Sequence, residues 1–294
     1  MRTLYREFET QAQIDAQYNP SLALATDANP MAHYQRQAQA ARATLPCMLG
    51  VPYGPTLAET LDIFPAQEPN APVFIFIHGG YWRALSSADF SGIALGLRPR
   101  GFTTVVVNYA LCPTVTIDEI VRQTRSACAW VLRHIGSYAG DPNRVAIGGH
   151  SAGAHLTAMC LQTAWSGDYG LPTDPFRAAI VVSGLYDLAP LRYSYLQPMI
   201  QIDEGTVQRN SPAFLTRSCR TPLWITWGAD ETSEFFRQSK VFHDAWLEKG
   251  NVALLEPQAQ ADHFTAIHGF ENPQSALCQW LASVCGSAAA DGRQ

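Results

Sequence analysis

The sequence predicts an α/β fold built on a mostly parallel, doubly wound sheet with helices on both faces. Three observations support this prediction. Short apolar runs rich in β-branched residues recur along the chain, and they are apolar throughout rather than alternating, which is typical of strands buried on both faces. Segments with helical spacing lie between these runs. Such alternation favours right-handed crossovers and a parallel sheet, in which ligands bind at the carboxyl ends of the strands.

Six apolar runs are the predicted strands. In chain order they cover residues 73–77, 103–109, 144–147, 178–183, 222–227 and, as the weakest prediction, 252–255. The predicted helices cover residues 116–135, 151–161 and 233–249. The first helix begins at a Thr116-x-x-Glu119 capping box, and Gly136 and Gly250 follow the ends of the first and third helices.

The 294 residues are expected to form one large domain, because neither an internal repeat nor a low-complexity linker divides the chain. We expect residues 1–50 to be an N-terminal extension that packs on the core, and residues 51–285 to be the domain itself. Within that domain, residues 185–215 are expected to form a small cap segment. Residues 286–294 are small and polar, and we expect them to be a flexible tail.

Composition excludes several classes of protein. With 47% hydrophobic and 15% charged residues, the chain has enough apolar side chains for a packed core and is not expected to be disordered. A net charge of −5 without any basic cluster gives no electrostatic basis for binding nucleic acid or an anionic membrane surface. We therefore expect a small-molecule substrate; the oligomeric state is left open, with a homodimer as one alternative.

Segments that would indicate export, membrane insertion or cofactor binding are missing from the sequence. No apolar run is long enough for a signal peptide or a membrane helix, and the seven scattered cysteines contain no CxxC pair. We therefore expect reduced thiols in a cytoplasmic protein. Neither an HExxH metal motif nor a GxGxxG dinucleotide loop occurs, so no metal or organic cofactor is expected.

The strongest motif is Gly149-His150-Ser151-Ala152-Gly153, which fits G-x-S-x-G between a predicted strand and a predicted helix. A tight strand-to-helix turn strains the serine backbone, and the two flanking glycines leave room for neighbouring chain. The helix N-terminus then favours negative charge that develops at the Ser151 hydroxyl. We therefore predict that Ser151 is a nucleophile rather than part of an ordinary glycine-rich turn.

A second motif, His78-Gly79-Gly80-Tyr81-Trp82, directly follows the first strong strand. Paired glycines at this position let the backbone turn its N–H groups toward a site, as an oxyanion loop does. The predicted donors are the backbone N–H groups of Gly80, Tyr81 and Ala152. Each such donor is typically worth ~3–4 kcal/mol of transition-state stabilisation. The alternative is an ordinary turn between a strand and a helix.

A serine nucleophile needs a histidine base, and eight histidines compete for that role. Most of them lie inside the two motifs, on predicted helices or in the N-terminal segment, and are better explained as structural or surface residues: His33, His78, His134, His150, His155 and His243. His263 and His268 remain, both after the last predicted strand. The loop around His263 can hold its ring over the carboxyl edge of the sheet, so we favour His263 over His268.

The acid that orients the histidine should follow the fifth predicted strand, where Asp230 and Glu231 are adjacent. Neighbouring residues in a loop point in different directions, so only one of the two carboxylates can meet His263. The acid usually stands three residues after the glycine that ends the strand, here Gly228. That spacing selects Glu231, with Asp230 as the alternative.

These motifs together resemble the kynurenine formamidase (arylformamidase) branch of the α/β-hydrolases, which is related to the hormone-sensitive-lipase-like esterases. The resemblance spans about residues 5–270 and is carried by HGGYW at 78–82, GHSAG at 149–153, DHF at 262–264 and shorter segments at 18–19, 183–188, 211–212 and 234–239. It implies an α/β-hydrolase fold with the nucleophile at Ser151, the histidine at His263 and the acid at Glu231. Familiar members have Asp at the acid position, where this chain has Glu.

The resemblance implies an enzyme that removes a formyl group from an arylamine, as in N-formylkynurenine, through a formyl-serine intermediate. A formyl group is small, so we expect Tyr81 and Trp82 to narrow the acyl side of the site. The expected aromatic wall on the leaving-group side consists of Tyr186, Tyr193, Tyr195 and Phe264. Neither the fold nor the triad sets the substrate, so the main alternative is a carboxylesterase or amidase that acts on small aryl substrates. A remote alternative is a non-catalytic homologue that only binds a ligand.

Overall fold

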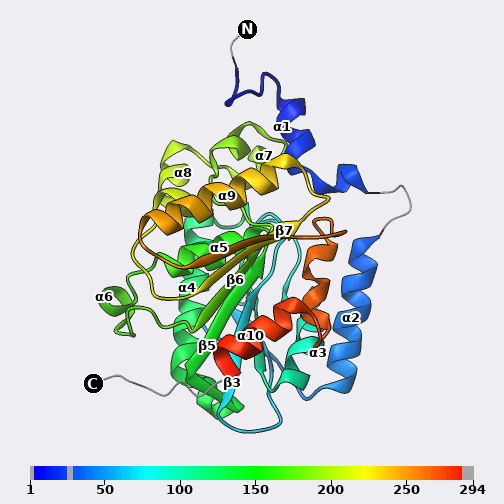
Figure 1. Cartoon of the computed structure of the whole chain (residues 1–294), viewed down its shortest axis with the longest axis vertical. Coiled ribbons are helices and arrows are strands. Elements are labelled where there is room, and N and C mark those ends of the chain that lie inside the picture. Colours follow the sequence, from blue (N-terminus) through cyan, green and yellow to red (C-terminus); the bar gives the residue numbers. More distant parts are fainter. Residues whose placement is uncertain (1–2, 25–28, 287–294) are drawn as a thin grey trace.

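A single eight-stranded sheet forms the centre of the computed structural model, which describes residues 3–24 and 29–286 (Figure 1). The strand order is β1-β2-β4-β3-β5-β6-β7-β8. In chain order the strands are β1 (Met48–Pro52), β2 (Thr60–Phe64), β3 (Ala71–Ile77), β4 (Thr103–Val107), β5 (Gly140–His150), β6 (Ala178–Val182), β7 (Leu223–Gly228) and β8 (Ala253–Gln258). Strand β2 runs antiparallel to β1 and β4, and all the other neighbouring pairs are parallel.

The six strands from β3 to β8 are those predicted from the apolar runs, so the prediction of a mostly parallel sheet is confirmed. Strands β1 and β2 were not predicted. Strand β1 lies at the edge of the sheet and is largely exposed. Strand β2 contains Asp62, whose buried carboxylate accepts hydrogen bonds from the Gly50 N–H and the Ser87 hydroxyl at 2.9 Å each. Asp62 thus interrupts the apolar run in β2, and Gly50 and Pro52, residue types that are depleted in strands, weaken the strand signal in β1.

The helices predicted from sequence are also present, as α4, α5 and α9. The α-helices among the described residues are α1 (Gln11–Tyr18), α2 (Pro30–Thr44), α3 (Ala94–Leu97), α4 (Ile117–His134), α5 (Ala152–Leu161), α6 (Trp165–Tyr169), α7 (Gln197–Ile200), α8 (Glu204–Asn210), α9 (Ser233–Glu248) and α10 (Ala276–Gly286). None of the helices in this part of the chain combines the length and the apolarity that crossing a bilayer requires.

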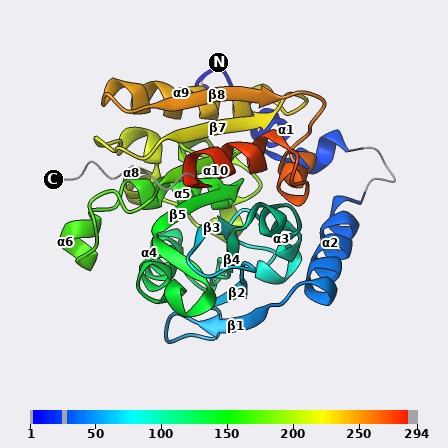
Figure 2. The same cartoon turned by 60° about the horizontal axis from the view of Figure 1, so that its bottom comes forward.

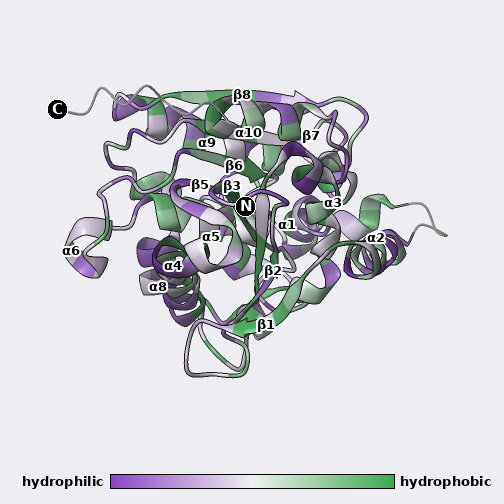
Figure 3. Ribbon diagram, turned by 90° about the horizontal axis from the view of Figure 1, so that it is seen from below, coloured by the Kyte–Doolittle hydropathy of each residue, from purple (hydrophilic) through white to green (hydrophobic). Residues whose placement is uncertain are grey.

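Helices cover both faces of the sheet, which confirms the doubly wound arrangement (Figures 2 and 3). On one face, α4, α5 and α9 pack on a hydrophobic cluster that includes Val131, Leu156 and Phe242. On the opposite face, α2, α3 and α10 pack on a second cluster, which includes Leu97 and Leu281. Strands β3, β4, β6 and β7 are buried from both sides, which explains why their sequences are largely apolar, whereas β8 lies at the edge of the sheet and is partly exposed.

The N-terminal segment enters the fold at two places. Helix α1 packs near α9, whereas α2 covers the face that also carries α3. Strand β1 begins at Met48, so the sheet starts just inside the segment that was expected to be an extension. Residues 185–215 form short helical pieces, among them α7 and α8. Of the expected tail, only Gly286 is described, as the last residue of α10, and residues 287–294 lie outside the described residues.

Candidate active site

Ser151 occupies the sharp turn between β5 and α5. Its backbone lies at φ 56° and ψ −119°, a conformation that L-residues rarely adopt. The flanking glycines are required by space: a Cβ at Gly149 would lie 2.4 Å from the Gly153 carbonyl oxygen, and a Cβ at Gly153 would lie 1.9 Å from that of Ile77. The turn therefore fixes Ser151 at the N-terminus of α5, over the carboxyl ends of β3 and β5.

His263 approaches Ser151 from the loop that follows β8. The Ser151 hydroxyl and His263 Nε2 are 3.1 Å apart, within hydrogen-bond distance. The imidazole is buried and packs against the ring of Phe235, with centroids 4.5 Å apart. The alternative base, His268, instead stacks on His33 with centroids 3.9 Å apart. Of the two histidines left open by the sequence, the structure thus brings His263 to the serine.

Glu231 lies on the far side of the imidazole. Its Oε2 is 2.7 Å from His263 Nδ1, and its Oε1 accepts hydrogen bonds from the Ser183 hydroxyl at 2.5 Å and the Gly228 N–H at 2.7 Å. These contacts satisfy both carboxylate oxygens in a buried position. Asp230 is exposed, and its own N–H bonds the Ala261 carbonyl. Of the two adjacent carboxylates, the structure therefore places Glu231 against the histidine.

The loop after β3 brings backbone donors to the same place. A Cβ at Gly79 would lie 3.1 Å from Ser151 Cβ, so this loop and the serine are in close contact. Within the described residues, the N–H groups of Gly80 and Tyr81 donate to no backbone carbonyl. The N–H of Ala152, at the first position of α5, has no partner within its helix. All three predicted donors are thus available to an oxyanion beside Ser151.

This loop is strained, and neighbouring groups hold it in place. Tyr81 and Trp82 have φ values of 50° and 56°, which costs on the order of 1–3 kcal/mol for each residue. The Tyr81 hydroxyl donates to the Tyr18 carbonyl, and Trp82 Nε1 donates to His155 Nδ1 at 3.2 Å. These bonds, from α1 and α5, offset the backbone strain and pre-organise the donors.

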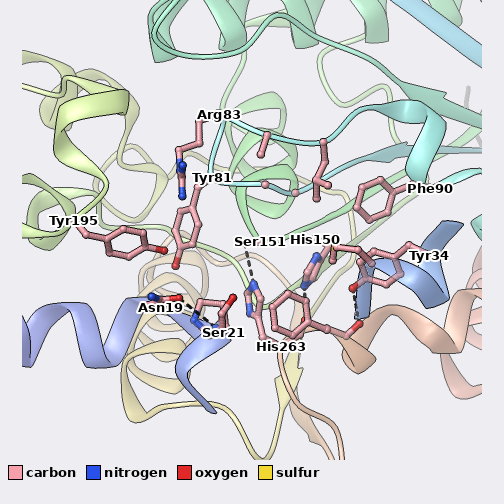
Figure 4. Close-up of a pocket in the computed structure, with 17 residues that line it drawn as sticks. Asn19, Ser21, Tyr34, Tyr81, Arg83, Phe90, His150, Ser151, Tyr195 and His263 are labelled. Carbon is pink, nitrogen blue, oxygen red and sulfur yellow. Dashed lines mark hydrogen bonds between the residues drawn. The ribbon is translucent and has the colours of Figure 1, made fainter. Parts of the chain in front are cut away.

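A cavity of about 150 Å³ opens beside Ser151 (Figure 4). Its lining residues come from the segment after β3, the turns around Ser151 and His263, the N-terminal segment and residues 185–215, which contribute Tyr195. They are Asn19, Pro20, Ser21, Met31, Tyr34, Gly79, Gly80, Tyr81, Arg83, Ala84, Leu85, Phe90, His150, Ser151, Tyr195, His263 and Phe264. The arrangement suits attack by the serine on a small, partly aromatic molecule, with proton transfer through the histidine.

Comparisons with known proteins agree with this geometry. A family model described as BD-FAE matches residues 61–174. A curated kynurenine formamidase of Danio rerio is 29% identical over 93% of this chain and 96% of its own length. A kynurenine formamidase of Salmo salar is 32% identical, and the match covers 84% of each protein. The chain belongs to the kynurenine formamidase family.

Membership in the kynurenine formamidase family makes the chain a hydrolase with the α/β-hydrolase fold. The fold is shared far beyond the family. The esterase of Pyrobaculum calidifontis, only 14% identical, superposes with a TM-score of 0.70, and the match covers 90% of this chain and 96% of the esterase.

In this member of the kynurenine formamidase family, the cavity wall differs from the predicted one. Tyr81, Tyr195 and Phe264 line the cavity, but Trp82, Tyr186 and Tyr193 do not. Trp82 is fully buried beneath the loop, because consecutive residues in a turn point in different directions. Tyr186 is also fully buried, and it stacks on Phe242 in the core with centroids 4.5 Å apart. The expectation for Trp82, Tyr186 and Tyr193 is therefore corrected.

Sequence reasoning missed the contribution of the N-terminal segment. Asn19 and Ser21 line one part of the cavity, and Met31 and Tyr34 line another. No local pattern marks these residues as part of a site. The one available signal is the Tyr18-Asn19 pair, which already carries part of the resemblance to the kynurenine formamidase family.

A buried polar network fastens this segment to α9. The Tyr18 hydroxyl bonds Glu234 and also accepts a hydrogen bond from Gln238 Nε2 at 3.0 Å. Arg237 pairs with Glu234 at 2.6 Å. Burial raises the pKa of the Tyr18 hydroxyl well above its ordinary value, with Glu234 acting in the same direction. Since the Tyr18 carbonyl holds Tyr81, the network couples α9 to the oxyanion loop.

Of the six histidines explained above as structural or surface residues, His78, His150 and His155 are buried. His155 uses both ring nitrogens, because Nδ1 accepts from Trp82 Nε1 and Nε2 donates to the Asn210 carbonyl at 2.8 Å. This pattern requires the neutral imidazole. Burial lowers the pKa of both His78 and His155 to about 4, and burial beside His263 lowers that of His150 well below its ordinary value.

We expect these histidines to make the fold sensitive to acid. Below pH 6.5 the unfolded chain binds protons that the folded histidines reject, so the free energy of unfolding falls as the pH drops toward 4. The loss should reach about 2–3 kcal/mol per histidine between pH 7 and 4.5, as measured by urea unfolding. His155→Gln should show a shallower pH dependence than the wild type, whereas exposed His134→Gln should not. Equal pH slopes in all three proteins would contradict the prediction.

Proposed function

We propose that this protein hydrolyses the formyl amide of an arylamine, of the N-formylkynurenine type, through a formyl-serine intermediate. The observation that carries the proposal is the connected geometry of Ser151, His263 and Glu231, at 3.1 and 2.7 Å, beside a cavity with free backbone donors. The relatives from Danio rerio and Salmo salar, both named kynurenine formamidases, support the choice of substrate.

The first half-reaction forms the acyl-enzyme. Ser151 Oγ attacks the formyl carbon while its proton moves to His263 Nε2. Glu231 keeps the proton of His263 on Nδ1 and stabilises the imidazolium that forms. The carbonyl oxygen becomes an oxyanion that accepts hydrogen bonds from the N–H groups of Gly80, Tyr81 and Ala152.

The second half-reaction releases the products. His263 donates its proton to the departing arylamine nitrogen, because an amide does not cleave unless its nitrogen is protonated. Water then enters, loses a proton to His263 Nε2 and attacks the formyl carbon on Ser151. Collapse of this second oxyanion returns the proton to Ser151 Oγ and releases formate. The sequence of steps uses only side chains and backbone groups of this chain.

The size of the cavity favours a small acyl group. The cavity of about 150 Å³ beside Ser151 is small, so we expect a formyl or acetyl group to fit next to the serine while the rest of the substrate extends along the cavity. The bond from the Tyr81 hydroxyl to the Tyr18 carbonyl also keeps the Tyr81 ring from swinging away. We expect kcat/KM for p-nitrophenyl esters to fall at least about tenfold from formyl or acetyl to hexanoyl, since the longer chain has no space. Faster cleavage of the hexanoyl ester would overturn the assignment of a formyl substrate.

Two measurements test the proposal against its alternatives. Comparing kcat/KM for N-formylkynurenine and formanilide with that for p-nitrophenyl acetate separates a formamidase from a general carboxylesterase or amidase. Turnover of the ester alone would favour the esterase. Labelling with an organophosphate serine probe, lost in Ser151→Ala, separates either enzyme from a non-catalytic binding protein, which would not be labelled.

A further inference from the structure

Arg83 places a positive charge in the wall of the cavity. It follows the oxyanion loop directly, and its backbone N–H donates to the Gly80 carbonyl at 3.0 Å. The residues that line the cavity include this one guanidinium and no carboxylate. Across the part of the chain that the structure describes, Arg83 makes no ion pair.

Some other partly buried arginines of this protein have carboxylate partners, whereas Arg98 and Arg144 donate to backbone carbonyls instead. Arg42 pairs with Asp62 at 2.9 Å, and Arg237 pairs with Glu234 at 2.6 Å. Arg83 is also partly buried, so its guanidinium has lost part of its hydration, but no carboxylate of the described residues pairs with it. A guanidinium with its fork of N–H donors matches the two oxygens of a carboxylate. The missing partner is thus one that a bound molecule can supply.

The position of Arg83 is fixed by aromatic neighbours. Its Cζ lies 5.9 Å from the centroid of the Tyr195 ring. Figure 4 shows Arg83 beside Tyr81 and Tyr195, whereas Tyr34 and Phe90 lie on the opposite side of Ser151. The cavity therefore has a cationic, hydrogen-bonding end and an apolar aromatic end, with the serine between them.

We propose that Arg83 binds a carboxylate on the leaving group, so that the enzyme selects acyl compounds whose arylamine or phenol part is anionic. This inference rests on the proposed function for the acyl amide, but the charge recognition does not depend on whether the bond cleaved is an amide or an ester. It assigns the cationic end of the cavity to the leaving group and gives the site a specificity that the triad alone cannot supply.

The test uses matched pairs of substrates. The first pair consists of two formanilides: one carries a 4-oxobutanoate chain ortho to the formamide, and in the other the carboxylate of that chain is replaced by a neutral primary amide. The second pair consists of two phenyl acetates that carry the same ortho chain, one ending in the carboxylate and the other in the primary amide. The measured quantity is the ratio of kcat/KM for the anionic member to that for the neutral member, which cancels any general effect of a mutation on the catalytic groups.

We expect the wild-type ratio to exceed about 10, and Arg83→Gln to lower it by about 10- to 100-fold, since a hydrogen bond between charged groups is lost. Arg83→Lys should keep part of the preference, and the wild-type ratio should fall at high salt. Arg220→Gln is the matched control. Arg220 lies just before β7, at the end of the strands opposite the site, and its side chain is 85% exposed. Removing its charge should therefore not change the ratio of kcat/KM values.

The outcomes separate the two proposals. If neither formanilide is cleaved but the ester pair shows the Arg83-dependent ratio, the formamidase function fails and the role of Arg83 stands. If formanilides are cleaved with a wild-type ratio near 1, or Arg83→Gln leaves the ratio unchanged, the role of Arg83 is overturned and the proposed function stands.

Discussion

Ser151→Ala is expected to lower kcat for a formanilide by about 10³–10⁶-fold while leaving the fold intact. The Ser151 hydroxyl lies 3.1 Å from His263 Nε2, where it can attack, and alanine removes that oxygen without adding bulk to the turn. The residual rate would come from substrate binding and from the backbone donors of the oxyanion loop. Steady-state kinetics together with circular dichroism would measure both parts of the prediction.

A second serine provides the control for this experiment. Ser166 is exposed on α6 and lines no part of the cavity, so Ser166→Ala should keep wild-type turnover and wild-type labelling by an organophosphate. Ser151→Ala should lose the label. A folded Ser151→Ala protein with turnover close to that of the wild type would remove the proposed mechanism.

Glu231→Gln is expected to lower kcat by about 10³–10⁴-fold. The amide can donate a hydrogen bond to His263 Nδ1, which fixes the wrong tautomer and leaves Nε2 protonated and unable to act as a base. The amide also cannot balance the imidazolium charge, and it places an NH₂ group among contacts built for an acceptor, the Ser183 hydroxyl and the Gly228 N–H. The kinetic effect should fall mainly on kcat, because the carboxylate does not line the main cavity.

Asp230→Asn is the matched comparison, since it makes the same chemical change one residue earlier. Asp230 is exposed, so kcat should stay within about twofold of the wild type. Glu231→Asp should fall between the two, because its shorter side chain draws the carboxylate away from an imidazole that Phe235 and Ser151 hold in place. A large loss in Asp230→Asn with little loss in Glu231→Gln would reverse the assignment of the acid.

The sequence by itself determined the features that depend on neighbouring residues. Strands β3, β4, β6 and β7 are buried on both faces, so each had to be a largely apolar run that could be recognised locally. Strand β8 was recognised from its apolar run although it lies at the partly exposed edge of the sheet. The turn at Ser151 admits only glycine at 149 and 153, because a Cβ there would collide with backbone oxygen or carbon atoms. Strands β1 and β2 were not predicted because Gly50 and Pro52 weaken the strand pattern of β1, and a hydrogen-bonded Asp62 interrupts the apolar run of β2.

Only the tertiary structure decided which side chains meet. Asp230 and Glu231 look alike in sequence, and the difference arises from contacts with Ser183 and His263, 48 and 32 residues away from Glu231. Trp82 turned into the core although Tyr81, its neighbour, faces the cavity. The N-terminal residues that complete the wall are held there by a buried network with α9. The physical reason is that local sterics fix a turn or a strand, whereas the direction of a side chain in an irregular segment is set by long-range packing and by buried polar groups that need partners.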